Sequence, residues 1–282
     1  MKTDIAPVIA RPARKIAEIE FSVVNGSTVV TRWRASNPFK LLVPHQRDRS
    51  AWVIGSNFGG GMLAGDEVDL TIASRAGSRG IFGTQASTKI YRSPAGATAR
   101  QTLTAELEAD SLLAVLPDPV ACFADARYEQ RQRFNLSVSA SLVALDWFTS
   151  GRIARGERWA MERYRSLNEI VVDGRRIAHD AVQLDRADGP IDTPFRTGRF
   201  NCLATAFIIG PMFTAIASDL LTAVHARPMA RQSDLLVSAS PLPGGAILRV
   251  AGVSIELVKS QLCERLAFLN EPLGIDPWSR KW

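Results

Sequence analysis

Polar and apolar residues alternate with a period of two through much of the first two-thirds of the chain. A strand points successive side chains to opposite faces, so this alternation predicts strands with one face in a core and one in water. Two uninterrupted apolar runs, 112–116 and 142–145, predict strands buried on both faces. The alternating segments are 18–23, 67–72, 102–108 and 134–140.

Turn-forming residues separate these predicted strands. Asn25-Gly26 and Asp173-Gly174 each stand between two strand-like segments. Both central residues of a type I′ turn have positive φ, which Asn, Asp and Gly tolerate. Both dipeptides are therefore expected to close β-hairpins.

The last third of the chain has a helical pattern. Pro211 suits the first turn of a helix, and apolar residues follow it at four-residue spacing until Pro228 ends the segment. A second apolar stripe begins near Ser254 and ends before Pro272. Residues 235–250, between the two predicted helices, favour two short strands joined by Pro-Leu-Pro-Gly-Gly.

These patterns predict one mainly β domain over residues 1–282. Its β-rich body covers about 15–200 and 235–250, and its two helices cover about 211–226 and 254–270. Residues 200–218 are free of charge and approach the ~20 residues of a membrane span. Asn201 and a Gly210-Pro211 break interrupt them, so a buried loop followed by a helix is expected instead.

Composition fits an ordinary globular protein with a basic surface. The 282 residues are 46% hydrophobic and 22% charged, and the net charge is +6, supplied almost entirely by arginine. This charge predicts a solvated basic surface or an acidic partner. Three cysteines without a C-x-x-C pair favour a reducing compartment. The N-terminus lacks an apolar signal region, so we expect the protein in the cytoplasm.

The glycine-rich segment 59–64 formally fits a dinucleotide-binding pattern, G-x-G-x-x-[GA]. Such a site needs a strand before the glycines and a helix after them. Residues 66–72 alternate like a strand, which favours a glycine-rich turn. Gly60 and Gly65 have P-loop spacing, but Asp66 stands where the lysine should be.

Local signals for catalysis or metal binding are weak. The sequence has no G-x-S-x-G elbow and no H-E-x-x-H motif, and its three histidines are far apart. A Ser-His-Asp arrangement assembled in space stays open. A metal site would need long-range convergence, and the residues considered for it are Cys122, Cys202, His45, His179 and His225.

Residues 151–176 hold seven arginines and four acidic residues, with Trp159 and Tyr164 among them. On strands, these charges would form cross-strand pairs on one solvated face. The same composition also suits a protein interface or a nucleic-acid groove. We rank the charge pairs first, a protein interface second and nucleic acid third.

Four pieces of the chain, in this order and spacing, together resemble the urease accessory protein UreD family, also called UreH. They are 59–66 (GGGMLAGD), 84–92 (TQASTKIYR), 116–123 (LPDPVACF) and 145–152 (LDWFTSGR), the last followed by GERW. The similarity is strong over about 55–157 and looser elsewhere. One departure is Gly83, where a strand former would be usual. The motif positions are Gly60, Gly65, Asp66, Thr84, Gln85, Lys89, Tyr91, Arg92, Pro117, Asp118, Pro119, Cys122, Gln130, Asp146, Gly151, Arg152 and Glu157.

The resemblance implies stacked sheets with β-helix-like winding and a small helical part. It implies a scaffold rather than an enzyme, acting with UreF and the GTPase UreG to insert nickel into apo-urease. By this resemblance the chain bridges the accessory complex to urease, holds no stable cofactor and passes nickel in transit. Nucleic acid and membrane are not expected partners. The alternatives are a hydrolase-type site assembled in space and a basic nucleic-acid-binding β protein.

Roles for single motif residues follow as hypotheses. If 84–92 is one strand, Lys89 lies on a polar inner face and pairs with Asp66 or Asp118, since an unpaired buried charge is costly. A nickel path needs weak oxygen or nitrogen ligands, because thiolates would trap the ion. The candidates for lining such a path are Asp66, Asp118, Asp146 and Glu157. Alternatively, these acidic residues only cap turns.

Overall fold

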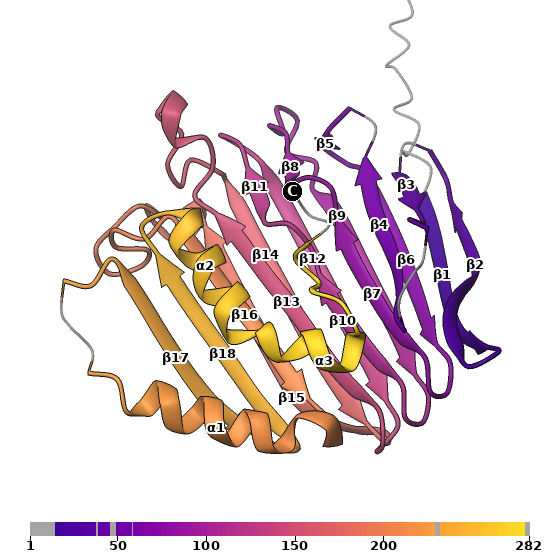
Figure 1. Cartoon of the computed structure of the whole chain (residues 1–282). Helices are drawn as coiled ribbons and strands as arrows, with labels where there is room; N and C mark the ends of the chain where they lie inside the picture. Colours follow the sequence, from indigo (N-terminus) through magenta and orange to yellow (C-terminus); the bar gives the residue numbers. More distant parts are fainter. Residues whose placement is uncertain (1–14, 38, 46–48, 58, 229–231, 280–282) are drawn as a thin grey trace, which may run out of the picture.

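The fold, seen in a computed structural model, consists of two stacked β-sheets with helices on one outer face (Figure 1). Residues 15–37, 39–45, 49–57, 59–228 and 232–279 are described, and all that follows concerns them. Sheet A has the strand order β15 (Arg175–Asp185), β14 (Arg163–Val172), β12 (Arg127–Leu136), β9 (Ala99–Leu107), β6 (Glu67–Ser74), β1 (Lys15–Val24) and β2 (Ser27–Ala35).

Sheet B is the wider of the two sheets. Its main path has the order β17 (Leu235–Leu242), β18 (Gly245–Gly252), β16 (Cys202–Ile209), β13 (Ser141–Thr149), β10 (Leu112–Leu116), β7 (Arg79–Thr84), β4 (Ala51–Asn57) and β3 (Phe39–Leu42). Three short strands extend it off this path, β5 (Gly61–Met62), β8 (Thr88–Ile90) and β11 (Val120–Cys122).

The chain winds between the sheets. From β6 to β14 its long strands alternate between sheet A and sheet B, and neighbours in each sheet run parallel: β6, β9, β12 and β14 in one, β7, β10 and β13 in the other. Antiparallel hairpins close the sheets at their ends. This confirms the mainly β fold with β-helix-like winding.

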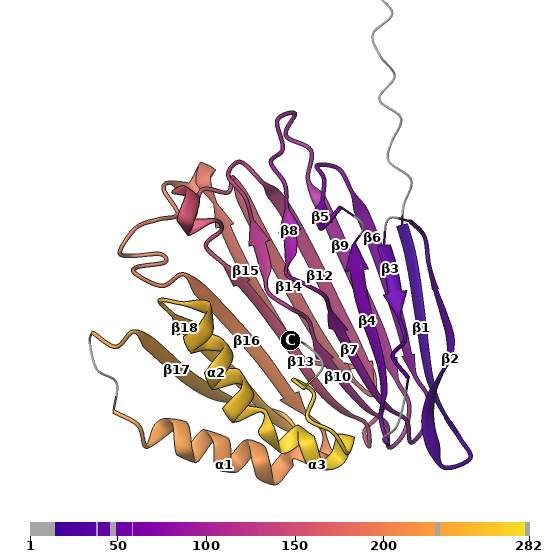
Figure 2. The same ribbon diagram turned by 45° about the horizontal axis from the view of Figure 1, so that its top comes forward.

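Two apolar layers hold the fold together. One lies between the sheets and contains the inward-facing residues of the alternating strands, such as Leu70, Leu103 and Phe134. The other lies between the outer face of sheet B and the helices α1 (Thr214–His225), α2 (Ile255–Arg265) and α3 (Asn270–Leu273) (Figure 2). Strands β10 and β13 lie between both layers, so the two apolar runs are buried on both faces, as predicted.

Both predicted hairpins form. Asn25 and Gly26 have φ of 51° and 80° and join β1 to β2, with Val24 paired to Ser27. Asp173 and Gly174 have φ of 48° and 74° and join β14 to β15. Positive φ at both positions is the geometry that these residue types tolerate. The two predicted strands at 235–250 also form, as β17 and β18.

Several predicted element boundaries are wrong. The first part of 200–218 is not a loop but β16, whose apolar residues contact both core layers. A short 3₁₀ turn, Pro211–Phe213, precedes α1, and a second one, Ala267–Leu269, separates α2 from α3. No described helix has the length and apolar character needed to cross a bilayer. Segment 84–92 is split between the end of β7, a turn and β8.

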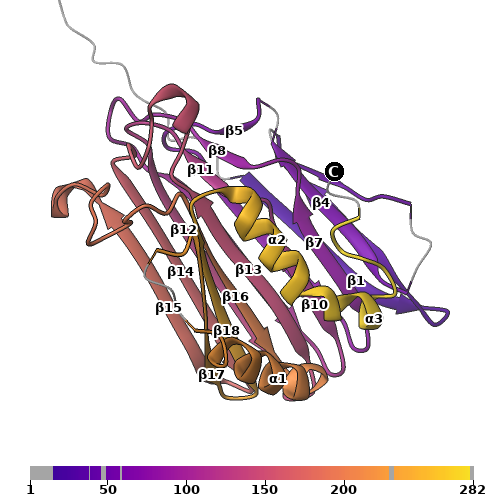
Figure 3. The ribbon, with the colours of Figure 1, turned by 60° about the vertical axis from the view of Figure 1, so that its left-hand side comes forward.

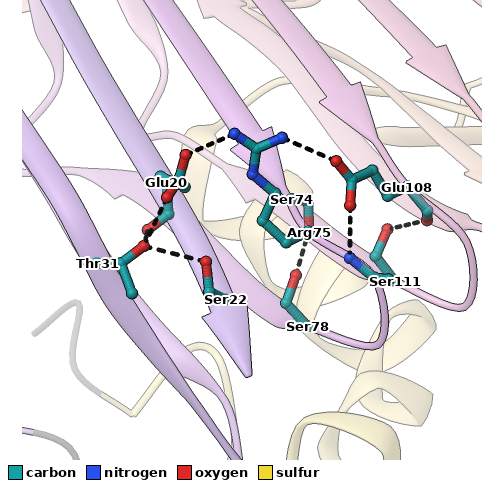
Figure 4. Close-up of polar contacts among 9 residues, drawn as sticks. Glu20, Ser22, Thr31, Ser74, Arg75, Ser78, Glu108 and Ser111 are labelled. Carbon is teal, nitrogen blue, oxygen red and sulfur yellow. Dashed lines mark hydrogen bonds and ion pairs between the residues drawn. The ribbon is translucent and has the colours of Figure 1, made fainter. Parts of the chain in front are cut away.

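Charged side chains tie the strand ends of sheet A together (Figure 4). Arg75, just after β6, donates to Glu20 on β1 at 2.7 Å and to Glu108, just after β9, at 2.8 Å. Glu108 also accepts the backbone N–H of Ala76 at 3.0 Å. Hydrogen bonding to Arg75 lowers the pKa of both carboxyls. The clamp joins three neighbouring strands at one turn of the winding.

Candidate functional site

A cluster of polar side chains interrupts the apolar layer between the two sheets. Asp146 projects from β13, and its Oδ1 accepts a hydrogen bond from Gln130 Nε2 on β12 at 3.0 Å. Its Oδ2 accepts from Ser166 Oγ at 2.5 Å and from Asn168 Nδ2 at 2.8 Å, both on β14. All four side chains are buried. One carboxyl group from sheet B is thus surrounded by three donors from sheet A.

The cluster continues along β12. Tyr128 donates its hydroxyl to Gln130 Oε1 at 3.1 Å, and Gln132 Nε2 donates to Asn168 Oδ1 at 2.9 Å. Tyr128 is also 3.3 Å from Gln101 Oε1 on β9. The inward positions of β12 and β14 alternate as on the other strands, but here they carry polar groups. We call this set, with Asp146, the inter-sheet polar cluster.

Burial raises the pKa of Asp146, because the low-dielectric core penalises the charged form. The hydrogen bonds from Ser166, Asn168 and Gln130 oppose that effect. Burial also raises the pKa of Tyr128 well above its ordinary value. The cluster therefore holds a single carboxyl whose charged form is disfavoured by burial and favoured by three hydrogen-bond donors.

Three cavities adjoin the polar cluster or one another through shared walls. The largest, about 370 Å³, is open and includes Asp146 in its lining. A second, about 20 Å³, lies between the sheets and is lined by Asp118, Gln130 and Asp146 among others. The third, about 30 Å³, lies beside Gly60 and Ser87. The two small ones share the walls Phe82, Thr84, Thr88 and Gln101.

The cavities form a series from the glycine-rich turn to the open end of the sandwich. Asp146 belongs to both the largest cavity and the enclosed one. Each small cavity has room for about one water molecule, for which ~10–15 Å³ is needed. A hydrated metal ion would have to shed water or widen the walls to pass. Oxygen-bearing side chains line this constricted part.

Two of the four candidate path residues line these cavities. Asp118 and Asp146 do, and both are buried. Asp66 and Glu157 do not. Asp66 Oδ2 caps the turn after the glycines by accepting the Leu63 N–H at 2.9 Å. Asp66 therefore caps a turn, as the alternative interpretation of these acidic residues expected.

Glu157 belongs to a second cluster, on the surface, where several motif pieces meet. Arg152 forms an ion pair with Glu157 and lies 3.9 Å above the Phe123 ring. Tyr91 packs edge-on against Phe123, with ring centroids 5.3 Å apart, and donates to Gly59 O at 2.9 Å. Hydrogen bonding to Arg152 lowers the pKa of Glu157. This set, which we call the surface motif cluster, joins pieces that are distant in sequence.

Other motif residues shape the backbone. Gly60 and Gly65 have positive φ, as expected for a glycine-rich turn that leads into a strand. Gly151 has φ 106°, and a Cβ there would lie 2.7 Å from Cys122 O. Only glycine fits that close approach. Cys122 is buried, and burial raises the pKa of its thiol.

The prolines and Thr84 support the cavity walls. Thr84 Oγ1 accepts the Asp118 N–H at 2.7 Å, and Pro117 O accepts the Trp147 indole N–H at 2.8 Å. Pro119 is buried beside them. By contrast, Gln85, Lys89 and Arg92 are exposed. The expectation of a buried Lys89 paired with Asp66 or Asp118 is wrong, because the turn at 85–87 rotates Lys89 outward.

Part of the inter-sheet polar cluster was not predicted from the sequence. Gln130 and Asp146 were motif positions, whereas Gln132, Ser166 and Asn168 were not named. A signal was present, because β12 keeps its period of two while its inward positions change from apolar to polar. Such a polar stretch on a buried face is the feature to search for.

The geometry gives little support to a hydrolase-type site or a metal site assembled in space. His179 is exposed on β15, and His225 at the end of α1 lies 3.1 Å from Ala239 O. Within the described residues, no group of three or more His, Cys, Asp or Glu side chains is placed to hold a metal. Three of the seven arginines of 151–176, Arg163, Arg165 and Arg176, form the cross-strand ion pairs that the first-ranked interpretation expected, for example Arg163 with Asp185 at 2.6 Å.

Comparisons with known proteins agree over nearly the whole chain. The family described as "UreD urease accessory protein" matches residues 14–282. A "Urease accessory protein UreD" of Anaeromyxobacter sp. (strain Fw109-5) is 43% identical over 280 residues, covering 97% of this chain and 94% of that protein. One of the same name from Sorangium cellulosum (strain So ce56) is 46% identical over 266 residues, with coverage of 94% and 83%. A "Urease accessory protein D" of Oryza sativa subsp. japonica is 32% identical over 297 residues, with coverage of 95% and 96%.

Proposed function

The chain belongs to the UreD urease accessory protein family, and from that premise we propose that it is a cytoplasmic scaffold for inserting nickel into apo-urease. In this role it bridges the UreF–UreG accessory complex to urease and catalyses no reaction itself. Nickel is cargo, carried in transit rather than held. The series of cavities that meets at Asp146 is the observation that supports this proposal most directly.

The chemistry of the cavity walls suits a mobile divalent ion. The ion meets the carboxyls of Asp118 and Asp146 and the side-chain oxygens of Gln130 and Thr84. Single carboxylates, amides and hydroxyls bind nickel weakly enough to release it, unlike a set of thiolates. The nearby thiol of Cys122 is buried, and burial raises its pKa, which disfavours the thiolate that would trap the ion.

Asp146 supplies a negative charge where an ion would lose its water. Burial raises its pKa, but an arriving dication would favour the charged form. The donors Ser166, Asn168 and Gln130 fix the orientation of the carboxyl group between passages. The path therefore has two separate buried carboxyls, Asp118 and Asp146, rather than a cage of charges around one point, which favours passage over storage.

The scaffold role is tested by reconstitution of the complex. The full chain would be co-expressed with apo-urease, UreF and UreG, and the purified assembly would be analysed for its protein content. The proposal predicts that UreF–UreG and urease co-purify only when this chain is present. Co-purification in its absence would overturn the bridging role. Turnover of ester or amide substrates by the isolated chain would favour the hydrolase alternative.

The path is tested separately by two carboxylate variants. Asp146→Asn removes a cavity-lining charge, whereas Asp66→Ala removes a carboxylate that caps a turn and lines none of the three cavities. The proposal predicts less nickel in urease activated with the first variant and near-normal nickel with the second. Equal loss in both would indicate a general effect on stability rather than a path through Asp146.

A further inference from the structure

Sheet B extends further than sheet A at one end of the sandwich. The contacts of Asp146 place β13 against β12 and β14. Beyond β14, sheet A has one more strand, β15, whereas beyond β13, sheet B has three, β16, β18 and β17. Figure 3 brings this end of the molecule forward. Among the described residues, the inner face of β17, the last strand of sheet B, therefore forms a shelf without a facing strand of sheet A.

The 370 Å³ cavity lies over this shelf. Its walls are mostly apolar and include Phe148, Val182, Leu203, Leu236 and Ala251, which come from five different strands. An ion pair between Arg249 on β18 and Asp180 on β15, at 2.7 Å, connects the two sheets beside it. The cavity is thus an apolar groove that follows the edge of sheet A.

Strand β15 forms the other side of the groove and is an open edge. It is 11 residues long, contains no proline and pairs only with β14 among the described strands. The Arg186 N–H points toward β14, since it donates to Glu162 O at 2.9 Å. Alternate residues face the other way in an antiparallel pair, so the amides of Ala181 and Gln183 point away from β14.

Long edges of this kind invite strand pairing, and proteins usually protect them. Neighbouring strands of a sheet lie ~4.8 Å apart, so the overhang of β17 leaves beside β15 about the width of one added strand. An extended segment that pairs with β15 would point every second side chain into the apolar groove. This is the geometry of β-strand addition.

We propose that an extended segment of a partner protein adds to β15 as the next strand of sheet A, and that its alternate apolar side chains cover the part of the groove over β17 and β18, leaving the part at Asp146 open. The proposal rests on the scaffold role, because it describes how one partner of the assembly binds. Arg175 and Arg176 are exposed at one end of β15. Acidic residues on the outward face of the segment would complement them.

A second copy of this chain does not fit the groove. Antiparallel pairing of two β15 strands about a two-fold axis would bring both overhanging shelves to the same side of the joined sheet. The overhanging β17 strands of the two copies would then occupy the same space. A single extended segment avoids this overlap, which is why we commit to a partner's strand.

Hydrogen exchange of backbone amides tests the proposal on the full chain, alone and in the purified complex with apo-urease, UreF and UreG. Amides of β15 such as Ala181 and Gln183 should exchange at least about tenfold more slowly in the complex, since each gains a hydrogen bond. Complexes lacking one component at a time identify which protein supplies the segment.

A matched pair of variants at one position isolates the edge. Ala181→Pro removes an amide that faces away from β14, and proline is tolerated at sheet edges. Ala181→Thr keeps that amide and favours a strand. We expect the proline variant to bind the partner about tenfold more weakly and the threonine variant to bind normally. Ser238→Trp, at an exposed position lining the groove, should block binding without touching β15.

Three outcomes would overturn the inference. One is an intact complex in which β15 amides exchange as fast as in the isolated chain. Another is equal partner affinity for the Ala181→Pro and Ala181→Thr proteins, with Ser238→Trp also unaffected. The third is protection of β15 that rises with the concentration of this chain alone, which indicates self-association. If no complex forms at all, the scaffold role itself fails, and that result is distinct from these three.

Discussion

Replacing Asp146 by Asn changes the charge of the inter-sheet polar cluster with almost no change in size. Asp146 accepts three hydrogen bonds, and an amide nitrogen in place of one oxygen cannot accept. At least one buried donor then loses its partner, which costs about 1–3 kcal/mol. For a chain of this size the melting temperature should fall by roughly 2–4 °C per kcal/mol. The variant should therefore fold and remain testable.

The effect of Asp146→Asn on nickel should be larger than its effect on stability. A unit charge ~4 Å from a dication contributes roughly 8 kcal/mol at an effective dielectric constant of 20, before desolvation is counted. Even if desolvation leaves only a small fraction of this energy, its loss in the Asn variant would slow nickel passage by tenfold or more. The assay is the nickel content per active site of urease co-expressed with the variant, with complex assembly checked by co-purification.

The stability of the same variant also has a predictable pH dependence. Burial raises the pKa of Asp146, so the native protein loses stability as pH rises through the carboxyl range. The Asn variant lacks this loss. Its deficit in unfolding free energy relative to the unsubstituted protein, measured by urea unfolding, should therefore shrink as pH rises through and above the ordinary carboxyl range. Unchanged nickel loading with an intact complex would refute the reasoning about the path.

Three further predictions concern stability and accessibility. Arg75→Ala should lower the urea midpoint most at neutral pH, because Arg75 lowers the pKa of two carboxyls whose stabilising effect is lost as pH falls; a gap constant with pH would contradict this. Gly245→Ala should destabilise by about 2–4 kcal/mol, since its Cβ would lie 1.9 Å from a carbonyl oxygen of β16. Gly244→Ala, whose Cβ would meet open space, should lose less stability than Gly245→Ala, although Gly244 has a φ of 74°. Thermal unfolding of the two variants measures this difference. In the native protein, Cys122 should resist a thiol reagent that modifies the half-buried Cys263, because Cys122 is buried and burial raises its pKa. Modification of Cys122 before Cys263 would contradict this burial.

Local patterns in the sequence were sufficient for the hairpins and the strand faces. Asn25-Gly26 and Asp173-Gly174 determine their turns because few other residues accept positive φ twice. Leu70, Leu103 and Phe134 lie inward as period-two alternation requires. The buried strand β10 was recognisable as an apolar run. In each case the information lies within a few neighbouring residues.

Features that depend on distant residues were harder to predict. An apolar run such as 202–209 fits a buried strand or a buried helix equally well, and only its pairing with β13 and β18 selects the strand. Lys89 was placed inward because the turn at 85–87 was not recognised. The polar cluster required knowing that β12 and β14 both face Asp146, which no local pattern contains.

Under the proposed function, urease receives its nickel with this chain as the scaffold. The most direct test is the nickel content of urease purified from cells with and without this chain, at equal UreF and UreG levels and fixed nickel supply. We expect urease protein in both preparations, with nickel near full occupancy only when the chain is present. Equal nickel occupancy in both preparations would contradict it.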